Sequence, residues 1–193
     1  DHSMSIADFV LAFVGIIIGL GVADLLISLH KLLRAGGRVK WHWATPSLAI
    51  LMLLVTLILW WWSFLWFSEI KSETIAGFLP KFLVLVVGFL MMAAALPDEV
   101  PDGGIDLRQF YLSSRVHLWL LMSITMGSII VIYFVDNWSF GVERLLAITW
   151  LTMTSLVLAV IATLTPRMWV HALAISWIFA VTIYNNLFIP IGQ

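Results

Sequence analysis

The polar side chain best able to do chemistry in this sequence is a carboxylate inside a long apolar run. Asp24 lies five residues before that run ends at Leu29, which is about 8 Å along a helix axis. A charged carboxylate at this depth in a bilayer costs a few kcal/mol, so it needs a partner or a proton. Ser28 and Lys31 follow at i+4 and i+7 on the same helical stripe. The pattern predicts either a polar functional site or a structural ion pair or hydrogen bond between helices.

Two later apolar segments also carry polar side chains at helical spacing. One row consists of Thr152, Ser155, Ala159 and Thr163, and the other consists of His171, Ala174, Ile178, Thr182 and Asn185. Such rows face the interior of a membrane bundle, where hydroxyls and amides find partners. They predict either hydrogen bonds between helices or a lined cavity, with the Asn185-Asn186 pair at its outer end. The intramembrane polar site that we predict consists of Asp24, Ser28, Lys31, Thr182 and Asn185.

Four histidines map to the same ends of four different apolar segments, and they are His30, His42, His117 and His171. Imidazoles at one depth can ligate a metal, hold a b-type haem between two helices, or titrate near neutral pH. None of them has the H-x-x-x-H spacing of a metal motif within one helix. The alternative is that these amphipathic side chains suit the membrane interface. The identity of a bound group therefore stays open among haem, a metal ion and a lipid.

Composition and absent motifs exclude several classes of function. The chain contains no cysteine, which removes disulfides and thiolate catalysis. Its net charge of −1 provides no basic surface for nucleic acid. The acidic stretch 98–106 lacks the alternating ligands of an EF-hand and predicts a solvated loop. No phosphate-binding loop, Rossmann fingerprint, serine-hydrolase elbow or zinc-protease motif is present, so the sequence favours a protein that is not an enzyme.

Transmembrane helices are the elements that must position these residues. Hydrophobic residues make up 62% of the 193 residues and charged residues 11%, whereas soluble domains carry about 25% charged residues. A bilayer core about 30 Å thick needs about 20 apolar residues of helix. Six segments are long enough, and they are residues 9–33, 45–67, 75–96, 116–135, 145–164 and 168–189. We predict an all-α, polytopic integral membrane bundle that forms a single domain over residues 4–193, and we leave residues 1–3 out because Met4 can be the native start.

Lysine and arginine in the loops predict the orientation of this bundle. Seven of them fall on one side, namely Lys31, Arg34, Arg38, Lys40, Arg108, Arg115 and Arg167. Three fall on the other side, namely Lys71, Lys81 and Arg144. Because basic residues accumulate in cytoplasmic loops, we expect the first, third and fifth loops in the cytoplasm and both termini outside.

The third loop contains a helix signal of its own. Asp106 is a suitable N-cap, and Leu107, Phe110 and Tyr111 then share one face at i, i+3 and i+4. This pattern predicts either a short interfacial helix or simply the first turns of the fourth span.

Tryptophans gather near both ends of the predicted spans, and the densest run is Trp60-Trp61-Trp62 with Trp66. Consecutive residues of a helix point about 100° apart, so three adjacent indoles cannot share one contact surface. The run predicts either an interfacial aromatic belt or an aromatic cage that docks a cofactor or lipid.

The first span has a face of small residues made by Ala12, Gly15, Gly19 and Ala23. Small side chains let two helices approach closely in lipid. The face predicts helix packing, and we expect it to contact a second copy of the chain or another subunit of a membrane complex.

The chain contains several short motifs, namely Gly19-Leu20-Gly21, Leu32-Leu33-Arg34 with the basic loop, Trp61-Trp62, Leu96-Pro97, and Asp106-Leu107-Arg108 with Tyr111. Together they resemble an uncharacterised family of bacterial multi-pass inner-membrane proteins. The resemblance implies a bacterial inner membrane, and it assigns no role to any residue.

Three functions are compatible with these features. The first is a small channel or transporter with its polar site around Asp24. The second is an accessory or assembly subunit of a larger membrane complex, whose partners lie in the bilayer. The third is a redox protein that binds haem or quinone through the histidines. We favour the first because of Asp24 and the polar rows.

Overall fold

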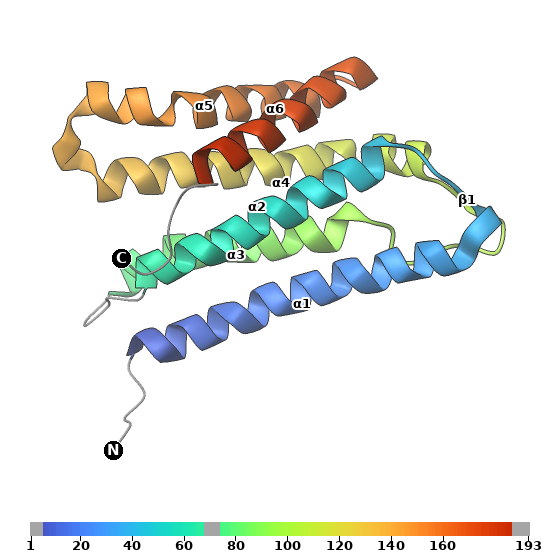
Figure 1. Ribbon diagram of the computed structural model, residues 1–193, viewed down its shortest axis with the longest axis horizontal. Helices are drawn as coiled ribbons and strands as arrows, with labels where there is room; N and C mark the ends of the chain where they lie inside the picture. Colours follow the sequence, from blue (N-terminus) through green and yellow to red (C-terminus); the bar gives the residue numbers. More distant parts are fainter. Residues whose placement is uncertain (1–5, 68–73, 187–193) are drawn as a thin grey trace.

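The computed structural model describes residues 6–67 and 74–186. In these ranges the chain forms six long helices, α1 (Ile6–Ala35), α2 (Ala44–Phe67), α3 (Ile75–Ala95), α4 (Leu107–Asp136), α5 (Val142–Leu164) and α6 (Met168–Asn186). All six are long and apolar enough to cross a membrane, and they run side by side along the long axis of the molecule (Figure 1). The prediction of an all-α, polytopic bundle is therefore confirmed.

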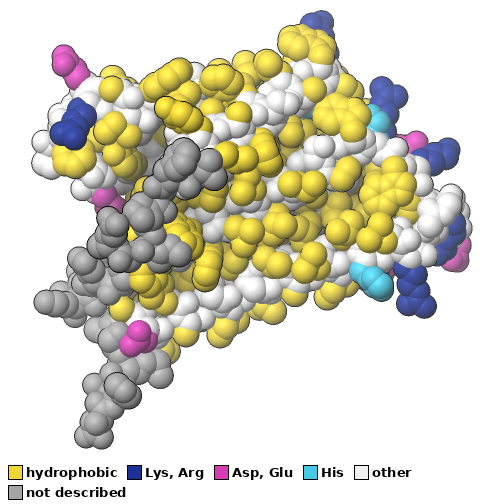
Figure 2. All heavy atoms as spheres, viewed as in Figure 1, with side chains coloured by type: hydrophobic (Ala, Val, Ile, Leu, Met, Phe, Trp, Pro, Cys, Tyr) yellow, Lys and Arg dark blue, Asp and Glu magenta, His cyan; other side chains and the backbone are white. Residues whose placement is uncertain are grey.

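Charged side chains gather at the two ends of the bundle, and hydrophobic side chains cover the surface between them (Figure 2). We call one end the basic end, because its loops and flanking turns carry Lys31, Arg34, Arg38, Lys40, Arg108 and Arg167. We call the other the terminal end, because α1 begins there and α6 ends there. This distribution is typical of a membrane span bounded by two aqueous layers.

The N-cap prediction at Asp106 is confirmed, and the helix that follows is continuous. The Asp106 carboxylate accepts hydrogen bonds from the backbone N–H groups of Arg108, at 2.9 Å, and Gln109, at 3.2 Å. Leu107 and Tyr111 are fully buried. Because these side chains pack into the core, α4 extends from Leu107 without a break, and a separate interfacial helix is not formed. The predicted start at residue 116 was therefore late.

Two loops at the basic end are joined by a small parallel sheet that the sequence analysis did not foresee. Strand β1 (Val39–Lys40), which follows the short helix η1 (Gly36–Arg38), pairs with β2 (Ile105–Asp106). Gly104 has a φ of +85°, and a Cβ there would lie 2.5 Å from the Arg38 carbonyl oxygen. Only glycine permits this conformation and close approach. A second short helix, η2 (Trp138–Phe140), connects α4 to α5 at the terminal end.

Glycines outside the predicted small-residue face allow the closest helix packing. A Cβ on Gly21 would lie 2.5 Å from Met92 Cε and 3.2 Å from Phe89 Cδ2, so this glycine brings α1 against α3. By contrast, a Cβ on Gly15 or Gly19 would meet nothing within 4 Å. The face of Ala12, Gly15, Gly19 and Ala23 therefore points away from the other described helices, and it is not what packs α1 into this bundle.

Candidate functional site: a cavity between four helices

A cavity of about 480 Å³ lies between α2, α4, α5 and α6, in the halves of these helices nearest the terminal end. Its polar walls are formed by Asp136, Asn137, Thr149, Thr152, Ser155, Thr182, Asn185 and Asn186. Its apolar walls are formed by Val55, Ile58, Leu59, Met126, Ile129, Ile130, Ile132, Ile148 and Val181. Trp62, Trp66 and Tyr133 complete the lining. The cavity is thus amphipathic, with its charged and amide groups at the helix ends.

Helical spacing explains why α5 and α6 present polar groups here. Thr149, Thr152 and Ser155 are three residues apart, and Thr182 and Asn185 are also three apart. Residues at this spacing share one face of a helix. The terminal-end halves of the two polar rows therefore line one cavity, which is one of the two alternatives that the sequence predicted. The remaining halves do not, because they lie deeper in the bundle toward the basic end.

Some of these polar groups are already satisfied by their own helices. Thr149 Oγ1 donates to the Leu145 carbonyl at 2.8 Å, and Ser155 Oγ donates to the Leu151 carbonyl at 2.9 Å. Hydroxyls of helical Ser and Thr commonly make this bond one turn back. These hydroxyls have already donated their protons and need no further acceptor, although each hydroxyl oxygen can still accept a hydrogen bond.

Other polar groups in the cavity have no hydrogen-bond partner among residues 6–67 and 74–186. They are the side chains of Thr152, Thr182 and Asn185. Thr182 is buried, Thr152 is half-buried and Asn185 is exposed at the end of α6, and an unpaired polar group is costlier the less water it meets. These three side chains, from α5 and α6, are therefore the groups best placed to bind a ligand that enters the cavity.

The tryptophan run of α2 divides between the cavity and the outside. Trp62 and Trp66, which are one turn apart, line the cavity, whereas Trp60 is exposed. Trp62 Nε1–H donates to Asn186 Oδ1 at 2.8 Å, and Asn186 Nδ2–H donates to the Thr182 carbonyl at 2.8 Å. Part of the run therefore lines the cavity and part faces outward, and Trp62 joins α2 to the end of α6.

An ion pair that the sequence analysis missed lies at the cavity wall. Lys81 Nζ of α3 lies 3.5 Å from the Asp136 carboxylate at the end of α4. The side chains are 16% and 39% exposed, so the lysine is the more buried partner. The available signal was a lysine inside the apolar segment 75–96, six residues after α3 begins, which requires a counter-charge at the same depth. The partner lies on a different helix, and its identity depends on the packing of α3 against α4.

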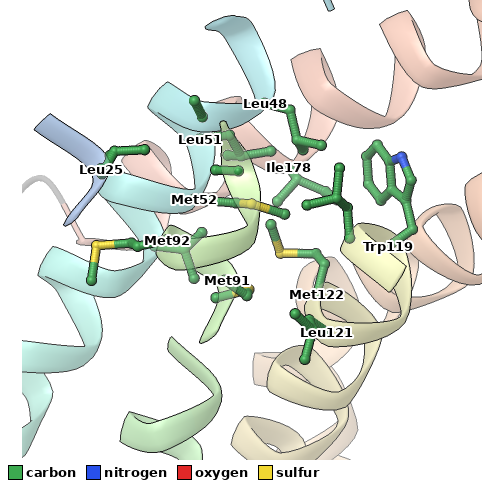
Figure 3. Close-up of a cluster of buried hydrophobic side chains, with 14 of the residues drawn as sticks. Leu25, Leu48, Leu51, Met52, Met91, Met92, Trp119, Leu121, Met122 and Ile178 are labelled. Carbon is green, nitrogen blue, oxygen red and sulfur yellow. The ribbon is translucent and has the colours of Figure 1, made fainter. Parts of the chain in front are cut away.

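Tightly packed side chains close the cavity toward the basic end. Figure 3 shows Leu48, Leu51 and Met52 of α2, Trp119 and Met122 of α4, and Ile178 of α6 in one cluster. All six are at most 1% exposed. The cavity lining includes none of them, so the cavity ends where this cluster begins.

A chain of hydrogen bonds follows the cluster toward the basic end. Trp119 Nε1–H donates to Tyr111 Oη at 3.0 Å, and Tyr111 Oη lies 2.9 Å from His171 Nδ1. His171 Nε2 lies 2.9 Å from the Thr165 carbonyl oxygen, which can only accept. The neutral His171 ring therefore carries its proton on Nε2, and Nδ1 accepts a hydrogen bond from the Tyr111 hydroxyl. We call Trp119, Tyr111 and His171 the polar latch; all three are fully buried.

The predicted five-residue polar site does not assemble. Thr182 and Asn185 line the cavity, but Asp24 and Ser28 of α1 are not among the lining residues. Lys31 Nζ donates to the Asp98 carbonyl at 2.8 Å, so it holds the third loop and does not pair with Asp24. Asp24 is partly buried and forms no hydrogen bond or ion pair with another residue in the described ranges. The helical face of Asp24 packs α1 on its neighbours, which Gly21 on the same face shows directly.

The four histidines at the basic end do not converge. His30 and His117 are exposed, and His42 Nδ1 accepts from the Ala44 N–H at the start of α2, at 3.4 Å. Both ring nitrogens of His171 already have hydrogen-bond partners, Tyr111 at Nδ1 and the Thr165 carbonyl at Nε2. In the part of the chain that the structure describes, no three His, Cys, Asp or Glu side chains come together as a metal site. A metal site that uses three or more of these side chains therefore has no support in the described residues.

The chain matches no protein-family model, no curated protein and no solved structure.

Proposed function

We propose that this protein is a small transporter of the bacterial inner membrane whose binding site is the cavity between α2, α4, α5 and α6. The observation that supports this proposal is the cavity itself, which has about 480 Å³ of space, apolar walls and several polar side chains. Ligand sites in proteins commonly have volumes of about 300–1,000 Å³ with a few placed polar groups. Such a site suits a small amphiphilic molecule, with its apolar part among the aliphatic walls.

Access from one side supports a carrier better than an open channel. The cluster around Trp119 and Ile178 fills the path toward the basic end. With the basic end in the cytoplasm, as the loop charges favour, the cavity faces outward. Transport then requires α6 to move relative to α4, so that the cluster and the polar latch open.

Occupancy is tested by photolabelling the purified protein in phosphatidylcholine vesicles with a straight-chain alcohol that carries a diazirine. Labelled residues are mapped by mass spectrometry, with the unlabelled alcohol as competitor. We expect saturable labelling of Met126, Ile129 and Thr152, which line the cavity.

The labelling should be lost in Ser155→Trp and in the milder Thr152→Phe, which fill the cavity. Val157→Trp on the exposed face of α5 is the matched control and should label like the wild type. Identical, unsaturable labelling in all four proteins would remove the cavity as a binding site.

Transport, as opposed to binding, is tested at Ala174, which is fully buried between the cavity and the basic end. In a transporter, Ala174→Cys should react slowly with a membrane-impermeant maleimide added on the basic side, and the alcohol should change that rate. Arg167→Cys, at an exposed position, provides the reference rate. An Ala174→Cys that never reacts, beside a reactive Arg167→Cys, would reduce the function to binding alone.

The second candidate is an accessory subunit of a membrane complex, and one observation favours it. The small-residue face of α1 has open space over Gly15 and Gly19. Close helix contacts in membranes use such faces. Co-purifying subunits that are lost in Gly15→Leu would support this candidate.

A further inference from the structure

We infer that the cavity selects a neutral amphiphile whose uncharged head both donates and accepts hydrogen bonds. This inference rests on the proposed function, because it names the class of molecule that the proposed site takes.

The first argument is the charge balance of the wall. Asp136 is the one Asp, Glu, Lys or Arg side chain among the described residues that line the cavity, and Lys81 Nζ forms an ion pair with its carboxylate at 3.5 Å. A singly charged ligand head that enters the cavity would give up part of its hydration and find no unpaired counter-charge among the lining residues. Burying a charge without a partner is strongly unfavourable. The wall therefore disfavours simple carboxylate and ammonium heads.

The second argument is the chemistry of the free polar groups. The hydroxyls of Thr152 and Thr182 and the amide of Asn185 have no hydrogen-bond partner in the described ranges. Each of these groups can donate and accept. A head with a hydroxyl, or with a hydroxyl and a carbonyl, satisfies them from both directions without bringing a charge. Trp62 and Asn186 bond to each other and so remain a fixed part of the wall.

The third argument is the opposite wall. Val55 and Leu59 of α2 and Met126 and Ile129 of α4 supply aliphatic surface and one adaptable thioether. The hydrophobic effect favours a hydrocarbon segment against these side chains. The polar groups of Thr152, Thr182 and Asn185 then set the direction in which the molecule lies, with its head toward α5 and α6.

The experiment compares three diazirine probes of equal chain length, with hydroxyl, carboxylate and trimethylammonium heads, in phosphatidylcholine vesicles. Labelling of cavity residues is divided by labelling of Ile16 and Leu20, which are exposed on α1 and report the probe concentration in the bilayer. We expect the hydroxyl probe to give the highest ratio. Thr182→Val with Asn185→Leu should lower that ratio about fivefold or more, since hydrogen bonds to the head are lost. Ser176→Ala changes an exposed residue of α6 and is the control, which should leave the labelling ratio unchanged.

Breaking the ion pair supplies the sharpest test. Lys81→Met leaves Asp136 without its cation and should shift the preference toward the trimethylammonium probe. Asp136→Asn leaves Lys81 unpaired and should shift it toward the carboxylate probe. A wild-type protein that prefers a charged probe would overturn the inference while the cavity remains the binding site. Cavity labelling by none of the three probes would overturn the proposed function itself.

Discussion

The Tyr111 hydroxyl of α4 donates a hydrogen bond to Nδ1 of His171 on α6, across 2.9 Å. Helix α4 packs mainly on α3 and α5, whereas α6 packs mainly on α5 and α2. The polar latch is therefore a direct polar tie between α4 and α6. Thr165, which precedes α6, anchors its far end through His171 Nε2. A motion that separates α4 from α6 at the basic end must break this hydrogen bond, and otherwise the two helices must move together.

Removing one hydroxyl from the latch should destabilise the protein. Tyr111→Phe leaves the Trp119 N–H and His171 Nδ1 buried without a partner, which costs about 1–3 kcal/mol. The measurement is unfolding in detergent, followed by circular dichroism. Tyr184→Phe is the matched control, because this tyrosine is 73% exposed and should tolerate the change. Equal losses at both tyrosines would contradict the structural role of the latch.

The latch also specifies the protonation of His171. Since Nε2 faces a carbonyl oxygen, we expect a neutral ring with its proton on Nε2. Nitrogen-15 spectra of histidine-labelled protein report which ring nitrogen carries the proton, and His171→Gln identifies the signal. A proton on Nδ1 would mean that Tyr111 accepts from the histidine, contrary to the chain of donors described above.

The six-span topology predicts that the first and fourth loops lie on opposite sides of the membrane. The chain has no native cysteine, so single cysteines can report on this directly. Gly37 and Ser139 are suitable exposed positions, whereas Gly141 has a φ of +81° that strains any side chain. We expect Gly37→Cys to react from the cytoplasmic side and Ser139→Cys from the outer side. Reaction of both from one side would exclude six spans.

The packing role of Gly21 can be separated from that of the outward glycines. Gly21→Ala forces a methyl group against Met92 and Phe89, and overpacking of this kind costs about 1–3 kcal/mol. Gly19→Ala meets open space and should leave the unfolding temperature unchanged. If the α1 face binds another subunit, Gly19→Leu should lower assembly in crosslinking without lowering the stability of the chain. A larger loss of stability at Gly19 than at Gly21 would show that α1 is rotated relative to this description.

Asp24 should be dispensable for ligand binding in the cavity. It is absent from the cavity lining, so Asp24→Asn should keep both the fold and the labelling of the cavity by the hydroxyl probe. Asp24→Leu also removes the polar group and shows whether a structural contact exists. Loss of cavity labelling in a well-folded Asp24→Asn protein would show that the Asp24 carboxylate contributes to ligand binding.

Run length and helical period were enough to predict the spans. An apolar segment of about 20 residues has few alternatives to a transmembrane helix, because every backbone polar group must be satisfied in lipid. Local chemistry was equally readable at Asp106, whose cap depends on neighbours within three residues. The polar rows of α5 and α6 also predicted a cavity correctly as one of two alternatives, since the helical period defines which residues share a face.

The partners of these faces were decided only by the tertiary structure. Thr152 and Thr182 share a cavity, and Tyr111 bonds His171 across a sequence separation of 60 residues. In a membrane helix the lipid-facing side is as apolar as the packed side, so the pattern of hydrophobic residues does not orient the helix. The small-residue face of α1, with Gly15 and Gly19, has open space beside it, so its expected contact with a second copy or another subunit stays a prediction. Only the packing of α1 on α3 reveals that Gly21 makes the close contact and that Asp24 lies outside the cavity.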